Sequence, residues 1–188
     1  MTEVIKRDGN KESLDIEKLH KVVSFACENV AGVSASQVEL NSQIQFFDGI
    51  KTEDVQETLI KSAADLISEE TPNYQWVAGR LINYHLRKMV YGRFDPPHLH
   101  SIVVKNVERG FYDDEILSSF SKAEFNKLNS YIKHQRDDNL TYAAMEQFRG
   151  KYLVQNRVTK EIFETPQIAY MLIAMTLFQH YKENRIKI

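Results

Sequence analysis

The stretch VIKRDGNKESLDIEKLHKV, residues 4–22, decides how the N-terminal part of this chain folds. Its Asp-Gly pair at residues 8–9 lies between two short alternating runs, which is a strong hairpin signal because glycine accepts positive φ at no steric cost. A helix is predicted from Asp15, ahead of apolar residues spaced three or four apart. The stretch therefore predicts a hairpin that carries Lys6 and Arg7 on one strand and leads into a helix.

This basic hairpin favours a polyphosphate site, since Lys and Arg neutralise phosphate oxygens and N–H groups at a helix N-terminus point at them. A solvated surface hairpin is the alternative. Micromolar binding requires about 8 kcal/mol, and one charge-assisted hydrogen bond contributes roughly 1.5–3 kcal/mol. Three or four cationic contacts and an apolar pocket would be enough, whereas a lysine pair would not. The polar residues predicted to gather there are Lys6, Arg7, Glu12, Lys18, Thr52 and Lys88.

Composition indicates a cytoplasmic globular protein. The formal net charge of −2 argues against a general nucleic-acid binder, which would carry a concentrated basic face. The single cysteine, Cys27, excludes an internal disulfide and a zinc ribbon built from paired cysteines, and no metal site is expected. The longest apolar run, residues 168–178, is too short to span a membrane, and no signal segment opens the chain.

The periodicity predicts a mainly α fold of the α+β class. Thr52 and Thr71 are predicted N-caps of two further helices, and the second of these should stop near Gly92. The phrase YGRFDPP, residues 91–97, then breaks the pattern. We therefore predict two domains, residues 1–92 and 93–188.

The predicted second domain contains three helices and a second hairpin. Ser121 and Glu124 have the spacing of a capping box, and Thr165 with Pro166 is typical of a helix start. The expected helices run from Ser121 to about Gln135, from Thr141 to about Lys151 and from Thr165 through Phe178, with the hairpin in YLVQNRVTKEIFE, residues 152–164.

Long phrases of the chain resemble the large (α) subunit of class I ribonucleotide reductases from enteric bacteria and their phages. They are VIKRDG (4–9), SQVELNSQIQFFDGIKTEDVQETLIKSAADLI (36–67), PNYQWVAGRLINYHLRKMVYGRFDPP (72–97) and KYLVQNRVTKEIFETPQ (151–167). The resemblance extends to about Gln179. It implies an ATP cone, a small helical bundle capped by a short β-hairpin or sheet, followed by an all-helical segment with the second hairpin.

The resemblance implies a role for individual residues of the cone. Lys6 and Arg7 match the basic pair that reaches the nucleotide phosphates, Lys18 a phosphate or ribose contact, and Lys88 a lysine that closes the phosphate site. Thr52 matches a residue that approaches the phosphates at a helix start. Glu12 and Asp15 match the adenine-facing edge, and Val4, Leu14 and Leu19 match the apolar pocket walls.

Two residues depart from the pattern of the enteric enzymes. Asp15 replaces an amide, so it could accept a hydrogen bond from the adenine amino group but could not donate one. Gln56 replaces a histidine near the sugar and phosphates. Both changes would bear on nucleotide affinity or discrimination.

The implied function is allosteric, because one cysteine cannot supply both a thiyl radical and a redox-active pair, and we predict no catalytic residue in this chain. ATP in the cone would favour an active assembly and dATP an inhibited one, with Mg²⁺ expected on the nucleotide. The implied partners are the remainder of the large subunit and the small radical-generating subunit, in an oligomeric holoenzyme without nucleic acid or membrane. The alternatives are a non-catalytic ATP-cone regulator and a helical interaction module that has lost nucleotide binding.

The ending QHYKENRIKI, residues 179–188, no longer resembles the family. We therefore expect either a truncated or a naturally divided subunit that works with a chain carrying the catalytic barrel. Ile168, Leu172 and Phe178 are expected to form the apolar helix faces that such a partner covers.

Overall fold

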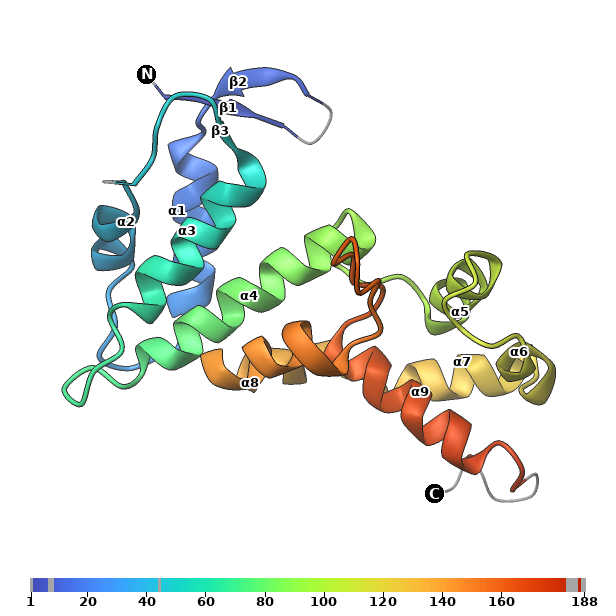
Figure 1. Ribbon diagram of the computed structural model, residues 1–188. Coiled ribbons are helices and arrows are strands. Elements are labelled where there is room, and N and C mark those ends of the chain that lie inside the picture. Colours follow the sequence, from blue (N-terminus) through green and yellow to red (C-terminus); the bar gives the residue numbers. More distant parts are fainter. Residues whose placement is uncertain (1, 7–8, 44, 182–185, 187–188) are drawn as a thin grey trace. The chain divides into compact units, whose positions relative to one another are not determined.

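The computed structural model describes residues 2–6, 9–43, 45–181 and 186, and helices make up most of them (Figure 1). The chain forms two compact units. The first contains residues 1–85 and 138–146, and the second contains residues 86–137 and 147–188. The predicted mainly α fold with a small sheet is confirmed. These units do not coincide with the predicted domains 1–92 and 93–188, which remain a prediction.

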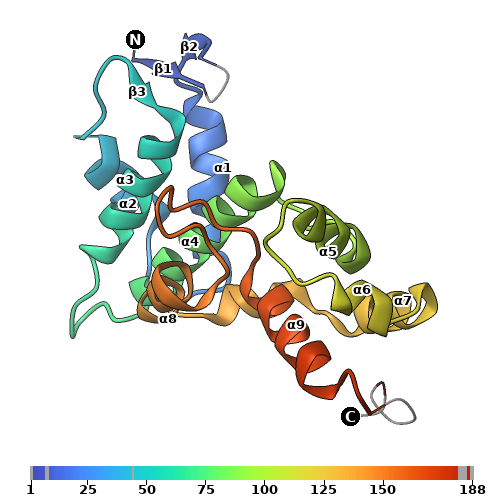
Figure 2. The same ribbon diagram turned by 45° about the vertical axis from the view of Figure 1, so that its right-hand side comes forward.

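A three-stranded sheet in the order β2-β1-β3 lies at one end of α1 and α3 in the first unit (Figures 1 and 2). β1 pairs with β2 in the antiparallel sense, as the hairpin signal predicted, and with β3 in the parallel sense. The elements of this unit are β1 (Glu3–Ile5), β2 (Lys11–Ser13), α1 (Ile16–Cys27), α2 (Ala35–Gln43), β3 (Ile50–Lys51), α3 (Thr52–Ala64), the first part of α4 (Tyr74–Tyr91) and most of α8 (Tyr142–Gln147).

The helices of this unit enclose its apolar core. The periodic residues Leu19, Val23 and Ala26 of α1 are buried, as their spacing predicted. Tyr74, only 1% exposed, fills the centre, and its hydroxyl donates to Gln37 Oε1 on α2. Burial of an aromatic ring with a satisfied hydroxyl stabilises the packing of α4 on α2.

The second unit is helical around a separate core. Its core residues come mainly from α5, α7 and α9, and they include Phe125 and Ile168. Its elements are the end of α4, α5 (Leu99–Glu108), α6 (Glu115–Ser119), α7 (Lys122–Tyr131), most of the 3₁₀ helix η1 (His134–Asn139), the π-helical η2 (Phe148–Tyr152) and α9 (Pro166–Phe178).

Two predicted N-caps are wrong. Thr52 is the first residue of α3, because the extended residue before the helix is Lys51 at the end of β3. α4 begins at Tyr74 and not at Thr71, because the Thr71 hydroxyl donates backward to Leu66 O at 2.7 Å. The predicted stop near Gly92 is confirmed, with Gly92 at a φ of 70° directly after the helix.

In the second unit the capping box of Ser121 and Glu124 is confirmed, but α7 ends at Tyr131 and not near Gln135. The predicted second hairpin is reduced to a single antiparallel bridge between Gln155 and Ile162. The last helix begins at Pro166 and ends at Phe178 as predicted.

Of the three residues predicted to face a partner, Ile168 is wrong, whereas Leu172 and Phe178 are half-buried. Ile168 is fully buried in the core of the second unit, and Leu172 packs against that core. The large apolar residues of α9 that face solvent are Tyr170, Ile173 and Leu177.

Candidate functional site

The parallel pairing of β1 and β3 brings two predicted site residues to one edge of the sheet. Ile5 lies opposite Lys51 in the parallel register. Because parallel strands leave a sheet at the same edge, Lys6 follows β1 where Thr52 follows β3. A lysine and the N-terminus of the 13-residue α3 are therefore adjacent.

This helix start has the properties of an anion site, with one opposing contribution. Lys51 makes no side-chain cap hydrogen bond, and the N-terminal end of a helix favours an anion through its dipole and its N–H donors. Glu53 and Asp54 stand in the same turn, where they stabilise the helix dipole but repel phosphate. Cationic side chains are therefore needed to hold a polyphosphate at this edge.

Lys6 is held by the hairpin but lies just outside β1, not on the strand as predicted. Its backbone N–H donates to Asn10 O at 2.8 Å, and Gly9, with a φ of 84°, donates back to Lys6 O at 3.0 Å. The Lys6 ammonium lies 2.6 Å from Glu12 Oε2, and both side chains are partly exposed. Arg7, the other half of the predicted basic pair, lies outside the described residues.

Asp15 and Lys18 form the start of α1. Asp15, where the helix was predicted to begin, is its N-cap, and its Oδ1 accepts from Lys18 N at 3.0 Å. The Lys18 ammonium lies 3.2 Å from Asp15 Oδ2 and is largely exposed. The backbone hydrogen bond from Lys18, with help from its ammonium, lowers the pKa of Asp15. Asp15 is thus an ionised acceptor at neutral pH.

The other predicted site residues occupy different environments. Val4 and Leu19 are core residues, 2% and 5% exposed, and Leu14 is half-buried. Gln56 lies one turn after Thr52 on the same face of α3, and its Oε1 is buried without a hydrogen bond from the described part of the chain. Lys88 belongs to α4 in the second unit, so its place in the site stays a prediction.

Lys51 is a cation that the sequence analysis missed. It is exposed and lies beside β1 at the edge where Lys6 emerges. It was missed because β3 has only two residues, too few to show alternation. The segment before β3 is held to β1 by Asp48 Oδ1, which accepts from Glu3 N at 2.7 Å, and by Gly49 N, which donates to Glu3 O at 2.9 Å. The Asp48-Gly49 pair was the sequence signal available for this turn, and Gly49 has a φ of 84° in the structure.

The described residues form neither a metal-binding cluster nor a membrane-spanning helix. Residues 2–6, 9–43, 45–181 and 186 include no group of three or more His, Cys, Asp or Glu placed to hold a metal ion. In the same part of the chain, no helix combines the length and apolarity required to cross a membrane.

Comparison with known proteins identifies both parts of the chain. Residues 2–89 match the ATP cone domain, and residues 138–188 match the ribonucleotide reductase all-alpha domain. The chain is 51% identical over 185 residues to the ribonucleoside-diphosphate reductase 1 subunit alpha of Escherichia coli, an alignment that covers 98% of this chain and 24% of that protein. It is 42% identical over 186 residues to the subunit alpha of enterobacteria phage T4, again over 98% and 24%. The chain thus spans about a quarter of the length of these relatives.

Proposed function

Since this chain belongs to the ribonucleotide reductase large-subunit family as a counterpart of its N-terminal region, we propose that it binds ATP and dATP as an allosteric regulator of ribonucleoside-diphosphate reduction. The observation that carries the proposal is the parallel pairing of β1 and β3, which puts Lys6 beside the N-terminus of α3. A helix N-terminus and an adjacent ammonium group are a recurrent phosphate-binding arrangement.

The triphosphate binds at this edge. Its oxygens accept from the first-turn N–H groups of α3, the Thr52 hydroxyl and the ammonium groups of Lys6 and Lys18. The positive charges of Arg7 and Lys88 help to neutralise the triphosphate, and Lys51 adds to the local positive potential. Mg²⁺ accompanies the nucleotide. Gln56 faces the sugar and phosphates.

The adenine ring lies toward β2 and the start of α1. Asp15 accepts from the adenine amino group, since a carboxylate retains lone pairs after accepting from the Lys18 backbone. Val4, Leu14 and Leu19 form the apolar wall behind the base.

Binding exchanges partners within the Lys6–Glu12 ion pair. A phosphate oxygen replaces Glu12 Oε2 on the Lys6 ammonium. Because both side chains are partly exposed, their ion pair contributes little, and a charged phosphate competes well against it. The released Glu12 carboxylate can then accept from the adenine edge.

The regulated activity requires the part of the large subunit that corresponds to the remaining three quarters of the relatives. The chain contributes no catalytic residue to it. ATP in the cone favours the active assembly with the small radical-generating subunit, and dATP favours an inhibited oligomer. The protein acts in the cytoplasm, where ribonucleotides are reduced.

Isothermal titration of the 188-residue chain with Mg·ATP and Mg·dATP tests this proposal. Lys6→Ala should weaken binding roughly 10- to 150-fold, the equivalent of one charge-assisted hydrogen bond. Lys6→Ala combined with Arg7→Ala should remove more than half of the binding free energy. Lys61→Ala, at the opposite end of α3 from Thr52, is the matched control and should bind normally.

The titrations also distinguish the alternatives. Equal affinity of wild type and Lys6→Ala would refute the assigned phosphate site. Absence of any binding to the folded wild-type chain would favour a helical interaction module that has lost the nucleotide. A chain that binds both nucleotides but does not associate with the rest of a large subunit would favour a non-catalytic regulator.

A further inference from the structure

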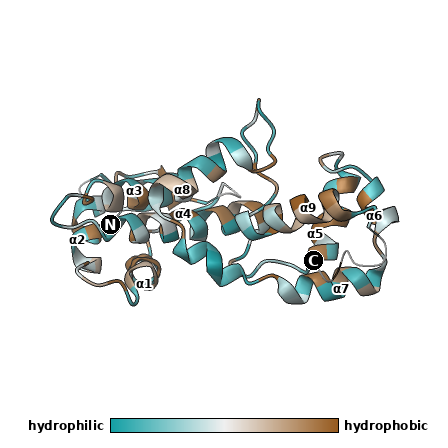
Figure 3. Cartoon of the chain, turned by 90° about the horizontal axis from the view of Figure 1, so that it is seen from below, coloured by the Kyte–Doolittle hydropathy of each residue, from teal (hydrophilic) through white to brown (hydrophobic). Residues whose placement is uncertain are grey.

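α9 presents an apolar stripe to solvent in the second unit. Tyr170, Ile173 and Leu177 recur at helical spacing on one face, and they are 52%, 57% and 66% exposed. Figure 3 shows the hydrophobic character of this helix. Scattered apolar residues are common on protein surfaces, whereas a contiguous apolar patch marks an interaction site.

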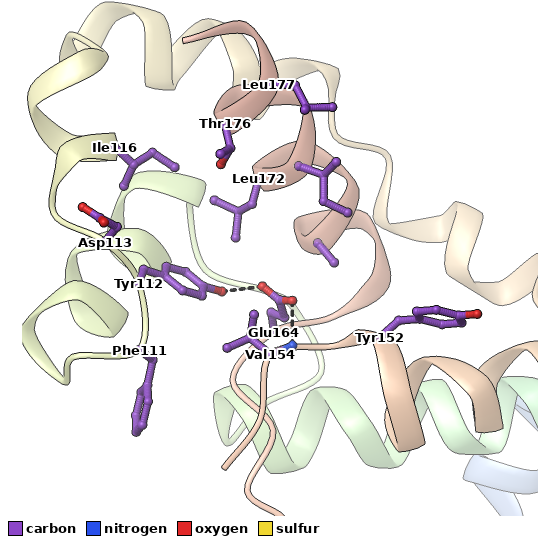
Figure 4. Close-up of a pocket in the computed structure, with 12 residues that line it drawn as sticks. Phe111, Tyr112, Asp113, Ile116, Tyr152, Val154, Glu164, Leu172, Thr176 and Leu177 are labelled. Atoms are coloured by element: carbon purple, nitrogen blue, oxygen red, sulfur yellow. Dashed lines mark hydrogen bonds between the residues drawn. The ribbon is translucent and has the colours of Figure 1, made fainter. Parts of the chain in front are cut away.

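A cleft of about 430 Å³ opens beside this stripe, and Ile173 and Leu177 belong to both (Figure 4). Its walls are apolar and come from three segments of the second unit, represented by Ile116 on α6, Val154 after η2 and Leu172 on α9. Tyr152, 61% exposed, stands at the edge of the cleft and extends the apolar surface. A groove of this kind, continuous with an exposed helix face, suits an amphipathic helix.

Glu164 gives the cleft an acidic character. It is only 2% exposed, and its two oxygens accept from the Tyr112 hydroxyl at 2.6 Å and from Val154 N at 2.9 Å. Asp113 is the other charged residue among those that line the cleft, so both charges are negative. Among the described residues no cationic side chain forms an ion pair with Glu164. Burial raises the pKa of the Glu164 carboxyl, and a cation placed beside it would favour the ionised form.

We propose that this stripe and cleft bind an amphipathic helix from the large-subunit polypeptide that corresponds to the remaining three quarters of the relatives, with one Lys or Arg directed at Glu164. The apolar face of that helix covers Ile173 and Leu177, while its cation neutralises the acidic cleft. The choice of partner rests on the proposed function, because the relatives continue for three times the length of this chain.

The charges favour this occupant over a second copy of the chain. In a symmetric pair the cleft would meet another α9, and α9 contains neither Lys nor Arg. Two acidic clefts would then approach each other without a neutralising cation, which is unfavourable in a buried contact.

The test is the affinity of the 188-residue chain for the complementary large-subunit polypeptide, measured by titration calorimetry on the separately purified components. Co-purification after co-expression of the two polypeptides is a second measure of the same association. Ile173→Glu with Leu177→Glu should weaken binding at least ten-fold. Val158→Glu is the matched control, because Val158 is 90% exposed in the same unit but does not line the cleft. It should bind like wild type.

Glu164→Gln tests the cation. Glutamine can accept from Val154 N and donate to the Tyr112 oxygen, so the local hydrogen bonds persist while the charge is lost. Binding should weaken about five- to ten-fold and lose part of its salt dependence. Normal far-UV circular dichroism of each variant would show that folding is intact.

Unchanged affinity of the Ile173/Leu177 double variant would overturn the docking surface, and unchanged affinity and salt dependence of Glu164→Gln would overturn the cation. Self-association of the chain alone that these variants abolish would assign the surface to a second copy. Nucleotide titrations separate this proposal from the function proposed above, because the docking variants should bind ATP as wild type does. Loss of ATP binding in Lys6→Ala should in turn leave docking unchanged.

Discussion

Replacing Gly79 with alanine should destabilise the first unit by roughly 2 kcal/mol. Gly79 lies inside α4, where glycine is otherwise unfavourable relative to alanine by about 0.8–1 kcal/mol. The reason for glycine is a close backbone approach: a Cβ at this position would lie 2.1 Å from Leu140 O and 2.9 Å from Thr141 C. Carbon atoms pack at about 3.5–4.0 Å, so the facing segment would have to move by about 1 Å or more.

The size of the effect follows from two opposing contributions. Overpacking typically costs about 1–3 kcal/mol, and a clash with backbone belongs at the upper end because no side chain can rotate away. The facing segment is also held in place by Asn83 Nδ2, which donates to Asp138 Oδ1 at 2.7 Å, and by Arg80 Nε, which donates to Asp138 O at 3.1 Å. Subtracting the gain in helix propensity leaves about 2 kcal/mol.

Urea unfolding followed by the fluorescence of Trp76, the single tryptophan, measures this loss because Trp76 lies in the same unit. Gly150→Ala is the control, since nothing lies within 4 Å of its added Cβ, and it should leave stability unchanged or slightly higher. Wild-type stability of Gly79→Ala would refute the close approach between α4 and the segment 138–146.

Three further predictions concern local chemistry. Ser121→Ala should lower the free energy of unfolding by about 1 kcal/mol because the capping box at α7 is lost, whereas Ser121→Thr should retain most of it. Burial raises the pKa of the Cys27 thiol to about 11, so at pH 8 a disulfide reagent should label Cys27 far more slowly in the native chain than in urea; equal rates would contradict this. The lowered pKa of Asp15 stabilises the folded state above the unfolded value of about 3.9, and this contribution disappears as pH falls through the folded value. Wild type should therefore exceed Asp15→Asn in urea stability at pH 7, and the difference should shrink as pH falls below about 3.9. A difference that stayed constant in acid would be evidence against ionisation as its cause.

Local signals sufficed where the interacting residues are close in sequence. The hairpin between β1 and β2, the start of α1 at Asp15 and the box of Ser121 and Glu124 each depend on contacts over about ten residues or fewer. In such cases the chain's own geometry selects the structure, and distant packing has little influence on the choice. The wider phrases carry the resemblance to the family, and with it to the ATP cone, independently of any tertiary contact.

The same local reasoning failed where a distant segment competes for the same group. Thr52 has the composition of an N-cap, but the parallel pairing of β3 with β1 keeps Lys51 extended and shifts the helix start by one residue. The Thr71 hydroxyl is taken by Leu66 O, which delays α4 until Tyr74.

The tertiary structure alone decided which charges meet and which apolar residues remain exposed. The sequence placed Lys6 and Thr52 in one site, but only the pairing across 45 residues makes them neighbours and adds Lys51. The apolar run of residues 168–178 did not distinguish the two sides of α9, and packing on one side then buried Ile168 while Ile173 stayed in solvent. A sequence specifies local conformation through short-range sterics and hydrogen bonds, whereas the composition of a site depends on long-range pairings whose energies are spread over many contacts.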